Sequence, residues 1–290
     1  DGKPEIRFAY PNNKESNFVD LFVTDGKASL AKVAPRSQEQ SLVIQPALME
    51  PAPYSAYQGD AVKRTGIEGL AQHDDISIIA IPDLMAKGPG QDKLDLQLVK
   101  SVQTALIAHC EGLGDRVAVL DTPPNMTAQE VKEWRMNTTG FDTSYAAMYY
   151  PWIEVMDAAT NQPIMMPPSG HIAGIWARSD SERGVHKAPA NEIVRGCTKL
   201  AYNVTKGEQD TLNPYGVNCI RFFPGMGYRV WGARTLASDA AWRYINVRRL
   251  FNMIEQTLRT STMWAVFEPN DQLLWSKLRR DVGNFLMGLY

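Results

Sequence analysis

Three continuous apolar stretches in the middle of the sequence constrain the fold more than any other feature. They are "ISIIAIPDL" (76–84), "RVAVLDTP" (116–123) and "YAAMYYPWIEVMD" (145–157). Each is a run of apolar or aromatic residues, so each predicts a strand. A strand that is apolar along its whole length is typical of a sheet covered on both faces.

Helical patterns fill the gaps between these strands. Residues 95–110 repeat apolar side chains with helical period, and Thr127 followed by Glu130 is the sequence of a capping box at a helix start. The order strand, helix, strand, helix, strand is typical of an α/β fold. We therefore predict a mixed α/β (α+β) domain with a central mixed β-sheet flanked by helices on both faces.

The C-terminal part adds two predicted strands, 219–224 and 228–236, which meet at a Gly-Met-Gly turn. The second strand is "GYRVWGARTL", expected to be central or nearly central in the sheet. Trp231 on this strand is expected to be largely buried, and so is Phe251 on the helix predicted at 242–259.

Two predicted helices close the sequence. The apolar stripe of the 242–259 helix consists of Val247, Leu250, Phe251, Ile254 and Leu258. The side expected to lie roughly opposite carries Arg248, Asn252, Glu255 and Arg259. In the last helix, from about residue 271, the stripe expected to face the core is Leu274, Leu278, Val282 and Phe285.

The residue pattern changes near residue 75. Residues 1–75 contain many prolines and short strand-like runs, and they are interpreted as a β-rich peripheral segment packed on the core. Residues 76–290 are interpreted as the core domain.

Charge is also distributed unevenly along the sequence. Residues 1–170 hold 14 basic and 22 acidic residues, and residues 171–290 hold 16 and 10, so the net charges are −8 and +6. Such polarity suits packing within a subunit or head-to-tail association of identical subunits.

Overall composition argues against several classes of protein. The net charge of −2 gives no whole-chain argument for binding nucleic acid or an anionic membrane. The longest apolar runs are shorter than a membrane-spanning helix requires, and we expect no signal peptide. Three widely spaced cysteines without a CxxC motif indicate a reducing compartment.

The sequence offers little for catalysis. It has neither a GxxxxGK[ST] loop nor a GxGxxG motif after a strand, and its four histidines are scattered. We therefore expect no catalytic residues, no cofactor and no metal, and we predict that the protein is not an enzyme. An α/β enzyme of unknown substrate remains the alternative function.

Arginine is concentrated near the C-terminal end of the sheet. The cluster consists of Arg221, Arg229, Arg234, Arg243, Arg248 and Arg249. A guanidinium group close to a core needs a carboxylate or carbonyl partner, so we interpret the cluster as a structural arginine network. Arg229 and Arg234 in particular are expected to pair with acidic residues of the same subunit. A phosphate-binding stripe would contain more lysine and fewer apolar residues, which disfavours nucleic acid as the partner.

Several long segments resemble the core of contractile tail sheath proteins. They are "PPSGHIAGIWARSDSERGVHKAPAN", "LNPYGVNCIRFFPGMGYRVWGARTL", "WRYINVRRLFNMIEQTL" and "VFEPND". The resemblance is dense over residues 145–290, looser over "AYQGDAVKRTGIEGLAQHDDISIIAIPD" and faint before that. The family includes the sheaths of myophages, of R-type bacteriocins and of extracellular contractile injection systems.

The resemblance implies a structural subunit that assembles helically around an inner tube in an extended, metastable state. A baseplate trigger then releases contraction, which drives the tube through a target envelope. The implied partners are other copies of the chain, the inner tube protein, and baseplate and terminator proteins, with no nucleic acid and no membrane insertion. The implied location is assembly in the bacterial cytoplasm, followed by residence in a virion or an extracellular particle.

The family also implies terminal arms that add strands to neighbouring subunits. This sequence ends at "FLMGLY", where the family continues, so we expect the chain as given to be monomeric or weakly associating. In resembling sheaths a short helix of the C-terminal domain touches the tube. Lys277, Arg279 and Arg280 are the candidate tube-facing residues on that basis.

Overall fold

The computed structural model describes residues 52–87 and 93–289, together with the backbone of strands β1 (Phe8–Ala9) and β2 (Asp20–Leu21). The chain divides into two compact units, Asp1–Glu50 and Pro51–Tyr290. In the first unit, β1 and β2 pair antiparallel. Most of the predicted β-rich segment 1–75 lies outside the described residues. The second unit begins with two short helices, α2 (Tyr54–Gln58) and α3 (Gly66–Gly69).

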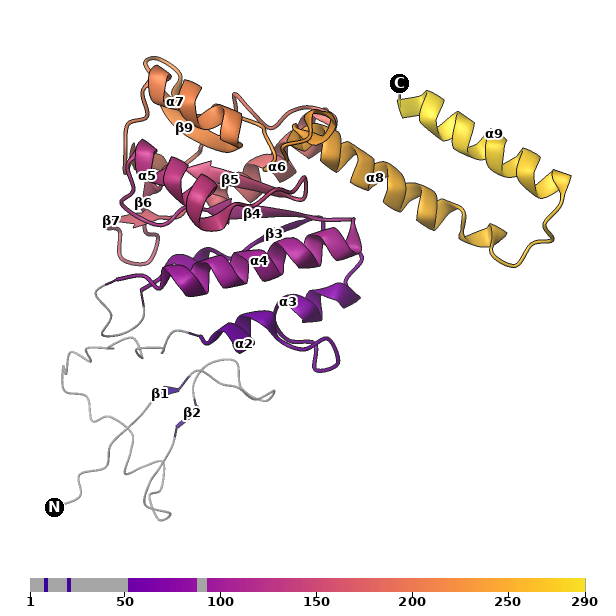
Figure 1. Ribbon diagram of the computed structural model, residues 1–290, viewed down its shortest axis with the longest axis horizontal. Helices are drawn as coiled ribbons and strands as arrows, with labels where there is room; N and C mark the ends of the chain where they lie inside the picture. Colours follow the sequence, from indigo (N-terminus) through magenta and orange to yellow (C-terminus); the bar gives the residue numbers. More distant parts are fainter. Residues whose placement is uncertain (1–7, 10–19, 22–51, 88–92, 290) are drawn as a thin grey trace, which may run out of the picture. The chain divides into compact units, whose positions relative to one another are not determined.

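A five-stranded mixed sheet forms the centre of the second unit, with strand order β10-β9-β5-β4-β3 (Figure 1). The first four strands in sequence run parallel, and β10 is antiparallel to β9. Their bounds are β3 Ile78–Ala80, β4 Val117–Asp121, β5 Ala146–Tyr150, β9 Val217–Phe223 and β10 Gly227–Val230. Every residue of β4 and β5 is buried. This is the environment that their continuous apolar sequences predict.

Helices cover both faces of this sheet, which confirms the predicted fold class (Figure 1). On one face the core is built with α4 (Leu96–Leu113), α5 (Ala128–Glu133) and α7 (Lys206–Leu212). On the other face it is built with α6 (Ser169–Arg183). Successive residues of the strands alternate between the two cores, because side chains of a strand point to opposite faces.

A second, smaller antiparallel sheet packs into the core on the α6 side. Its strand order is β7-β6-β8, with bounds β6 Ile153–Met156, β7 Pro163–Met166 and β8 Cys197–Leu200. The single strand predicted over 145–157 is therefore two strands, β5 and β6, which belong to different sheets. The break falls at Pro151, whose backbone lacks the N–H that would continue the ladder.

The helix starts follow their sequence signals. Asp95 caps α4 by accepting hydrogen bonds from the backbone N–H groups of Gln97 and Leu98, at 3.0 and 2.9 Å. The predicted capping box at Thr127 and Glu130 is present at the start of α5. Each cap satisfies donors that the first helical turn leaves without intrahelical partners.

The strand predicted at 228–236 is shorter and lies elsewhere in the sheet than expected. β10 ends at Val230 and occupies the sheet edge. Beyond it the Asn218 side chain bonds the backbone of Arg234, donating to its carbonyl at 2.8 Å and accepting from its N–H at 2.8 Å. At Arg234 these side-chain hydrogen bonds take the place of backbone bonds to β9, and the chain leaves the sheet. Trp231 is 36% exposed, and the prediction that it is largely buried is wrong.

Helix α8 (Ile245–Ser261) buries the opposite side from the one predicted. Its buried residues are Ile245, Arg248, Arg249 and Asn252. Phe251 is 43% exposed, which makes the expectation of a buried Phe251 wrong. The reason is that Asp180 on α6 binds the guanidinium group of Arg249, while Asn252 and Glu255 of α8 itself bind that of Arg248, so a polar face can pack inward.

Helix α9 (Gln272–Leu289) closes the described chain and has no fully buried residue. The stripe expected to face the core is half-buried, and its members are Leu274, Leu278, Val282 and Phe285. Large apolar side chains such as Leu273 and Met287 are exposed. The helix therefore leaves much of its apolar surface uncovered in the isolated chain.

The remaining described turns are short helical segments. They are η1 Leu70–Gln72, η2 Pro82–Met85, η3 Trp134–Thr139, η4 Asn213–Tyr215, η5 Ala240–Trp242 and η6 Met263–Ala265. Of these, η3 is a π-helix that continues α5, and the others are 3-10 helices.

Candidate functional site

The predicted arginine network divides into three pairs with different partners. Arg249, in the second turn of α8, donates from Nη1 to Asp180 Oδ1 at 2.9 Å and from Nη2 to Asp180 Oδ2 at 2.5 Å. Its guanidinium carbon lies 4.9 Å from the ring centre of Trp176, whose indole N–H donates to Tyr149 Oη at 3.1 Å. This bidentate, stacked geometry uses both the planar fork and the planar face of arginine.

Arg248 lies between two aromatic rings. Its guanidinium carbon is 4.1 Å from the ring centre of Trp242 and 4.7 Å from that of Tyr145. Its Nε donates to Asn252 Oδ1 at 2.7 Å, and Nη2 donates to Glu255 Oε1 at 3.3 Å. Cation–π attraction is stronger where water is excluded, and this side chain is only 6% exposed.

Arg248 and Arg249 together with Asp180, Trp176 and Trp242 form what we call the arginine joint. It joins the first two turns of α8 to α6 through Asp180 and Trp176, and to Trp242 just before the helix. These contacts are directional hydrogen bonds and ring-stacking interactions.

Arg221 and Arg229 are held by neutral oxygens. Arg221 donates to the carbonyl of Val204 at 3.2 Å and to Gln209 Oε1 at 2.9 Å. Arg229 donates from Nη1 to the carbonyl of Asn191 at 2.7 Å. The two arginines face each other in the β9–β10 ladder, and their side chains reach acceptors on neighbouring segments of the chain.

Arg234 and Arg243 take part through their backbones. Arg234 is bound by the Asn218 side chain, and the carbonyl of Arg243 accepts from the N–H of Thr235 at 2.9 Å. Within the described part of the chain, no carboxylate lies at ion-pair distance from Arg229 or Arg234. The expectation of acidic partners for these two residues is therefore wrong, and Arg248 and Arg249 have them instead.

The candidate tube-facing residues all lie exposed on α9. Lys277 Nζ sits 3.9 Å from the ring centre of Trp264, and Arg280 Nε lies 3.1 Å from Asp281 Oδ1. Arg279 is exposed on the same turn. These groups remain reachable by an acidic partner, because exposed pairs of this kind are weak.

Sequence reasoning missed a buried carboxyl group at the end of β4. Asp121 Oδ1 accepts from the backbone N–H of Ser169, the first residue of α6, at 2.9 Å. The Asp121 side chain is almost completely buried, and burial raises its pKa to about 7 against the hydrogen bonds from Ser169 that lower it. The only signal in the sequence was an acidic residue at the end of the apolar run "VAVLD".

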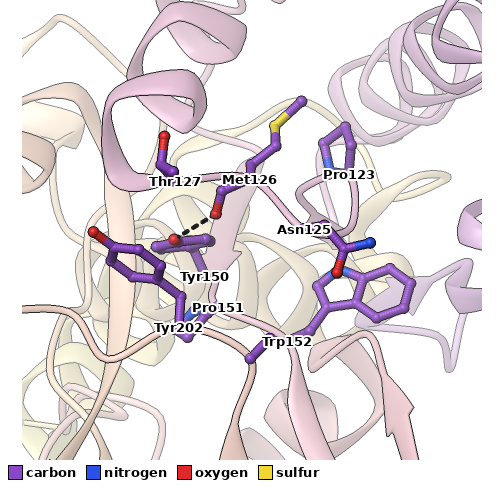
Figure 2. Close-up of a pocket in the computed structure, with 9 residues that line it drawn as sticks. Pro123, Asn125, Met126, Thr127, Tyr150, Pro151, Trp152 and Tyr202 are labelled. Carbon is purple, nitrogen blue, oxygen red and sulfur yellow. Dashed lines mark hydrogen bonds between the residues drawn. The ribbon is translucent and has the colours of Figure 1, made fainter.

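A pocket of about 180 Å³ opens beside this end of the sheet (Figure 2). Tyr150 and Tyr202 stand on one side and Trp152 with Asn125 on the other (Figure 2). The Tyr150 hydroxyl donates to the carbonyl of Met126 at 2.7 Å. In an α/β sheet the carboxyl ends of parallel strands are the usual place for a ligand, and these residues follow β4 and β5. We call this pocket the aromatic cage.

The described residues form neither a metal-ligand cluster nor a membrane-spanning helix. Within residues 52–87 and 93–289, no group of three His, Cys, Asp or Glu side chains gathers as metal ligands. The helices that the structure describes include none with the length and hydropathy of a membrane span.

Two family models match most of the second unit, Pro51–Tyr290. The model described as "Phage tail sheath protein central domain" matches residues 73–236, and "Phage tail sheath C-terminal domain" matches residues 237–289. The arginine joint therefore links the two matched regions, because Arg248 and Arg249 lie in the second and Asp180 in the first. A putative prophage major tail sheath protein from Pseudomonas aeruginosa is 28% identical over 71% of this chain and 51% of its own length.

Two solved structures give matches of similar extent. The helical sheath of the anti-feeding prophage in its contracted state is 32% identical, with a TM-score of 0.59, over 76% of this chain and 56% of that one. The baseplate of the same particle in its contracted state is 31% identical, with a TM-score of 0.61, over 84% and 68%. This chain spans about half the length of the Pseudomonas relative.

Proposed function

The chain belongs to the phage tail sheath family, and on that premise we propose that it is a structural subunit of a contractile sheath. The sheath would be that of a phage tail or of a phage-tail-like injection particle, including bacteriocins. The carrying observation is that the two family domains together match residues 73–289, almost the whole described second unit. The similarity to the sheath of the anti-feeding prophage supports the same proposal.

In the proposed mechanism, subunits assemble helically around an inner tube in an extended, metastable state. A signal from the baseplate releases them into a shorter and wider packing, which drives the tube through a target envelope. The energy is stored in subunit interfaces at assembly, so no nucleotide is consumed. The physical basis is rigid subunits with two alternative sets of contacts.

The described structure suits a rigid body of this kind. The two cores share the buried strands β4 and β5, and the arginine joint ties α8 to α6, which covers one face of these strands. Helix α9, by contrast, keeps a half-buried stripe and exposed cations. We propose that the sheet and its helices move as one unit and that α9 carries contacts that change between states.

The proposed partners are other copies of the chain, the inner tube protein, and baseplate and terminator proteins. We propose assembly in the bacterial cytoplasm before residence in the virion or extracellular particle, with neither nucleic acid nor membrane insertion involved. The protein has no catalytic role in this proposal. The alternative of an α/β enzyme has no observation in its favour.

The direct test is reconstitution of the full-length protein with the tube and baseplate proteins of the same particle. Electron microscopy should show striated rods of two lengths, extended before and contracted after triggering, with the tube protruding from the short ones. Tubes that form at normal length without this protein on their surface would contradict the proposal.

A further inference from the structure

The aromatic cage has the walls of a site for a positive charge. Tyr150, Trp152 and Tyr202 line it, and the rings of Tyr150 and Tyr202 lie 6.0 Å apart. The faces of aromatic rings carry negative partial charge, so a cation that enters the pocket against these faces is stabilised. At about 180 Å³ the cage is smaller than the clefts of roughly 300–1,000 Å³ that hold drug-sized ligands. Its size suits one side-chain head group.

Two carboxylates lie beside the lining residues. Glu130 Oε2 accepts from the backbone N–H and the hydroxyl of Thr127, at 2.7 and 2.8 Å. Glu208 accepts from the hydroxyl of Tyr202. The hydrogen bond from the N–H of Thr127 is the main cause that lowers the pKa of Glu130. The hydrogen bond from the Tyr202 hydroxyl is the main cause that lowers the pKa of Glu208. Both groups are therefore anions at neutral pH. Each belongs to a capping box, Glu130 with Thr127 at the start of α5 and Glu208 with Thr205 at the start of α7.

The structure provides no cation of its own for these anions. In the described parts of the chain, no Lys or Arg lies at ion-pair distance from Glu130 or Glu208. Lys132 on α5 instead lies 5.1 Å from the ring centre of Tyr215. The two carboxylates beside the cage are thus left for a cation from outside.

We propose that the aromatic cage binds an arginine or lysine side chain of a second copy of this chain. The proposal rests on the proposed function, which places identical subunits against one another. Charge complementarity points to the same occupant. Most of the cage comes from the part of the sequence with a net charge of −8, whereas residues 171–290 carry a net charge of +6. A phosphate group would meet the same carboxylates and be repelled.

The site itself can be tested on the purified chain. Fluorotryptophan labelling gives one ¹⁹F signal for each tryptophan, and Trp152→Phe assigns the signal of the cage. N-acetyl-arginine amide should shift that signal saturably, whereas N-acetyl-citrulline amide, which has the same shape without the charge, should not. Equal shifts with both probes, or no shift with arginine amide at saturating concentration, would overturn the proposal.

A charge-removing variant gives the matched control. Glu208→Gln should weaken binding of arginine amide about two- to fivefold, the range of a partly exposed ion pair. Glutamine still completes a capping box, so the fold is preserved. Glu182→Gln, on exposed α6 surface away from the cage, removes the same charge and should leave binding unchanged. Equal weakening by both variants contradicts a local role for Glu208.

The second copy is tested in the full-length protein assembled with its tube and baseplate. A photoreactive phenylalanine analogue in place of Tyr202 should cross-link one sheath subunit to a peptide of another that contains the bound Arg or Lys. Assembled sheath without a sheath-to-sheath cross-link would overturn this proposal and leave the proposed function intact. Failure to form any helical assembly with the unmodified protein would instead contradict the proposed function.

Discussion

Asp121 shows how a single buried group can set a pH dependence. Its folded-state pKa of about 7 lies above the usual aspartate value, because burial disfavours the charged form. The folded chain therefore keeps a proton that the unfolded chain releases near pH 4. Stability is fully present below that unfolded pKa and decreases as pH rises toward about 7.

Asp121→Asn should remove this dependence. Asparagine keeps an oxygen that can accept from the Ser169 N–H but cannot ionise. We expect the variant to gain about 3 kcal/mol relative to the unmodified protein between pH 5 and pH 9, measured by urea unfolding at both pH values.

Asp142→Asn serves as the control for this measurement. The hydroxyl of Ser238 is the main cause that lowers the pKa of Asp142. The stability that Asp142 contributes is lost as pH falls, not as pH rises. The Asp142→Asn variant should therefore show no gain in unfolding free energy at pH 9 relative to the unmodified protein. A gain equal to that of Asp121→Asn would contradict the assignment.

Two arginines of the network should respond differently to truncation. Arg249→Ala leaves Asp180 without its bidentate partner and removes a stacked group from Trp176. The expected loss is about 2–4 kcal/mol, slightly below the value for a fully buried pair because Asp180 is partly exposed. Arg229→Ala leaves only neutral oxygens and should cost about 1 kcal/mol. Similar losses for both variants in urea unfolding would contradict the division of the network.

At the scale of the element, α8 is anchored at one end. Ile245, Arg248, Arg249 and Asn252 are buried in its first two turns, and no buried residue follows them within the helix. Backbone amides of residues 249–252 should therefore exchange with D₂O at least about tenfold more slowly than those of 257–261. Exchange–mass spectrometry resolves the two segments. Uniform protection along the helix would show that its C-terminal half is equally held.

A pair of truncations tests the same gradient energetically. Ile245→Ala should cost about 2–5 kcal/mol, because the side chain is fully buried in the core. Leu258→Ala, at a half-buried position in the same helix, should cost about 1 kcal/mol. The reverse order would mean that the helix packs through its apolar stripe after all.

At the scale of the whole molecule, the cations of α9 are the proposed contact with the inner tube. Reversing the charge of Lys277, Arg279 and Arg280 in the full-length protein should prevent extended sheath from forming around the tube, or restrict it to low salt. Each exposed pair contributes only about 0.2–1 kcal/mol, so the effect depends on many subunits acting together. Sedimentation and electron microscopy measure rod length against salt concentration.

The matched control reverses three exposed cations elsewhere, Lys63, Arg183 and Arg195. This variant has the same net charge and should assemble normally. Sheath of normal length and salt tolerance from the α9 variant would remove these residues from the tube contact.

The sequence alone determined the elements whose signals are local. Continuous apolar runs identified β4 and β5, because a strand buried on both faces is apolar at nearly every position. The capping box at Thr127 and Glu130 marked a helix start, because its hydrogen bonds join residues three apart. The family resemblance also came from the sequence, since long segments carry more information than any single motif.

Only the tertiary structure decided which faces pack inward and where the chain leaves the sheet. The buried polar face of α8 depends on Asp180, 69 positions earlier in the sequence. The early end of β10 depends on Asn218, and the aromatic cage joins the ends of two strands to a loop near residue 202. Hydrophobic periodicity assumes that apolar residues face the core. It cannot anticipate a guanidinium whose burial is stabilised by a carboxylate and an aromatic ring from distant parts of the chain.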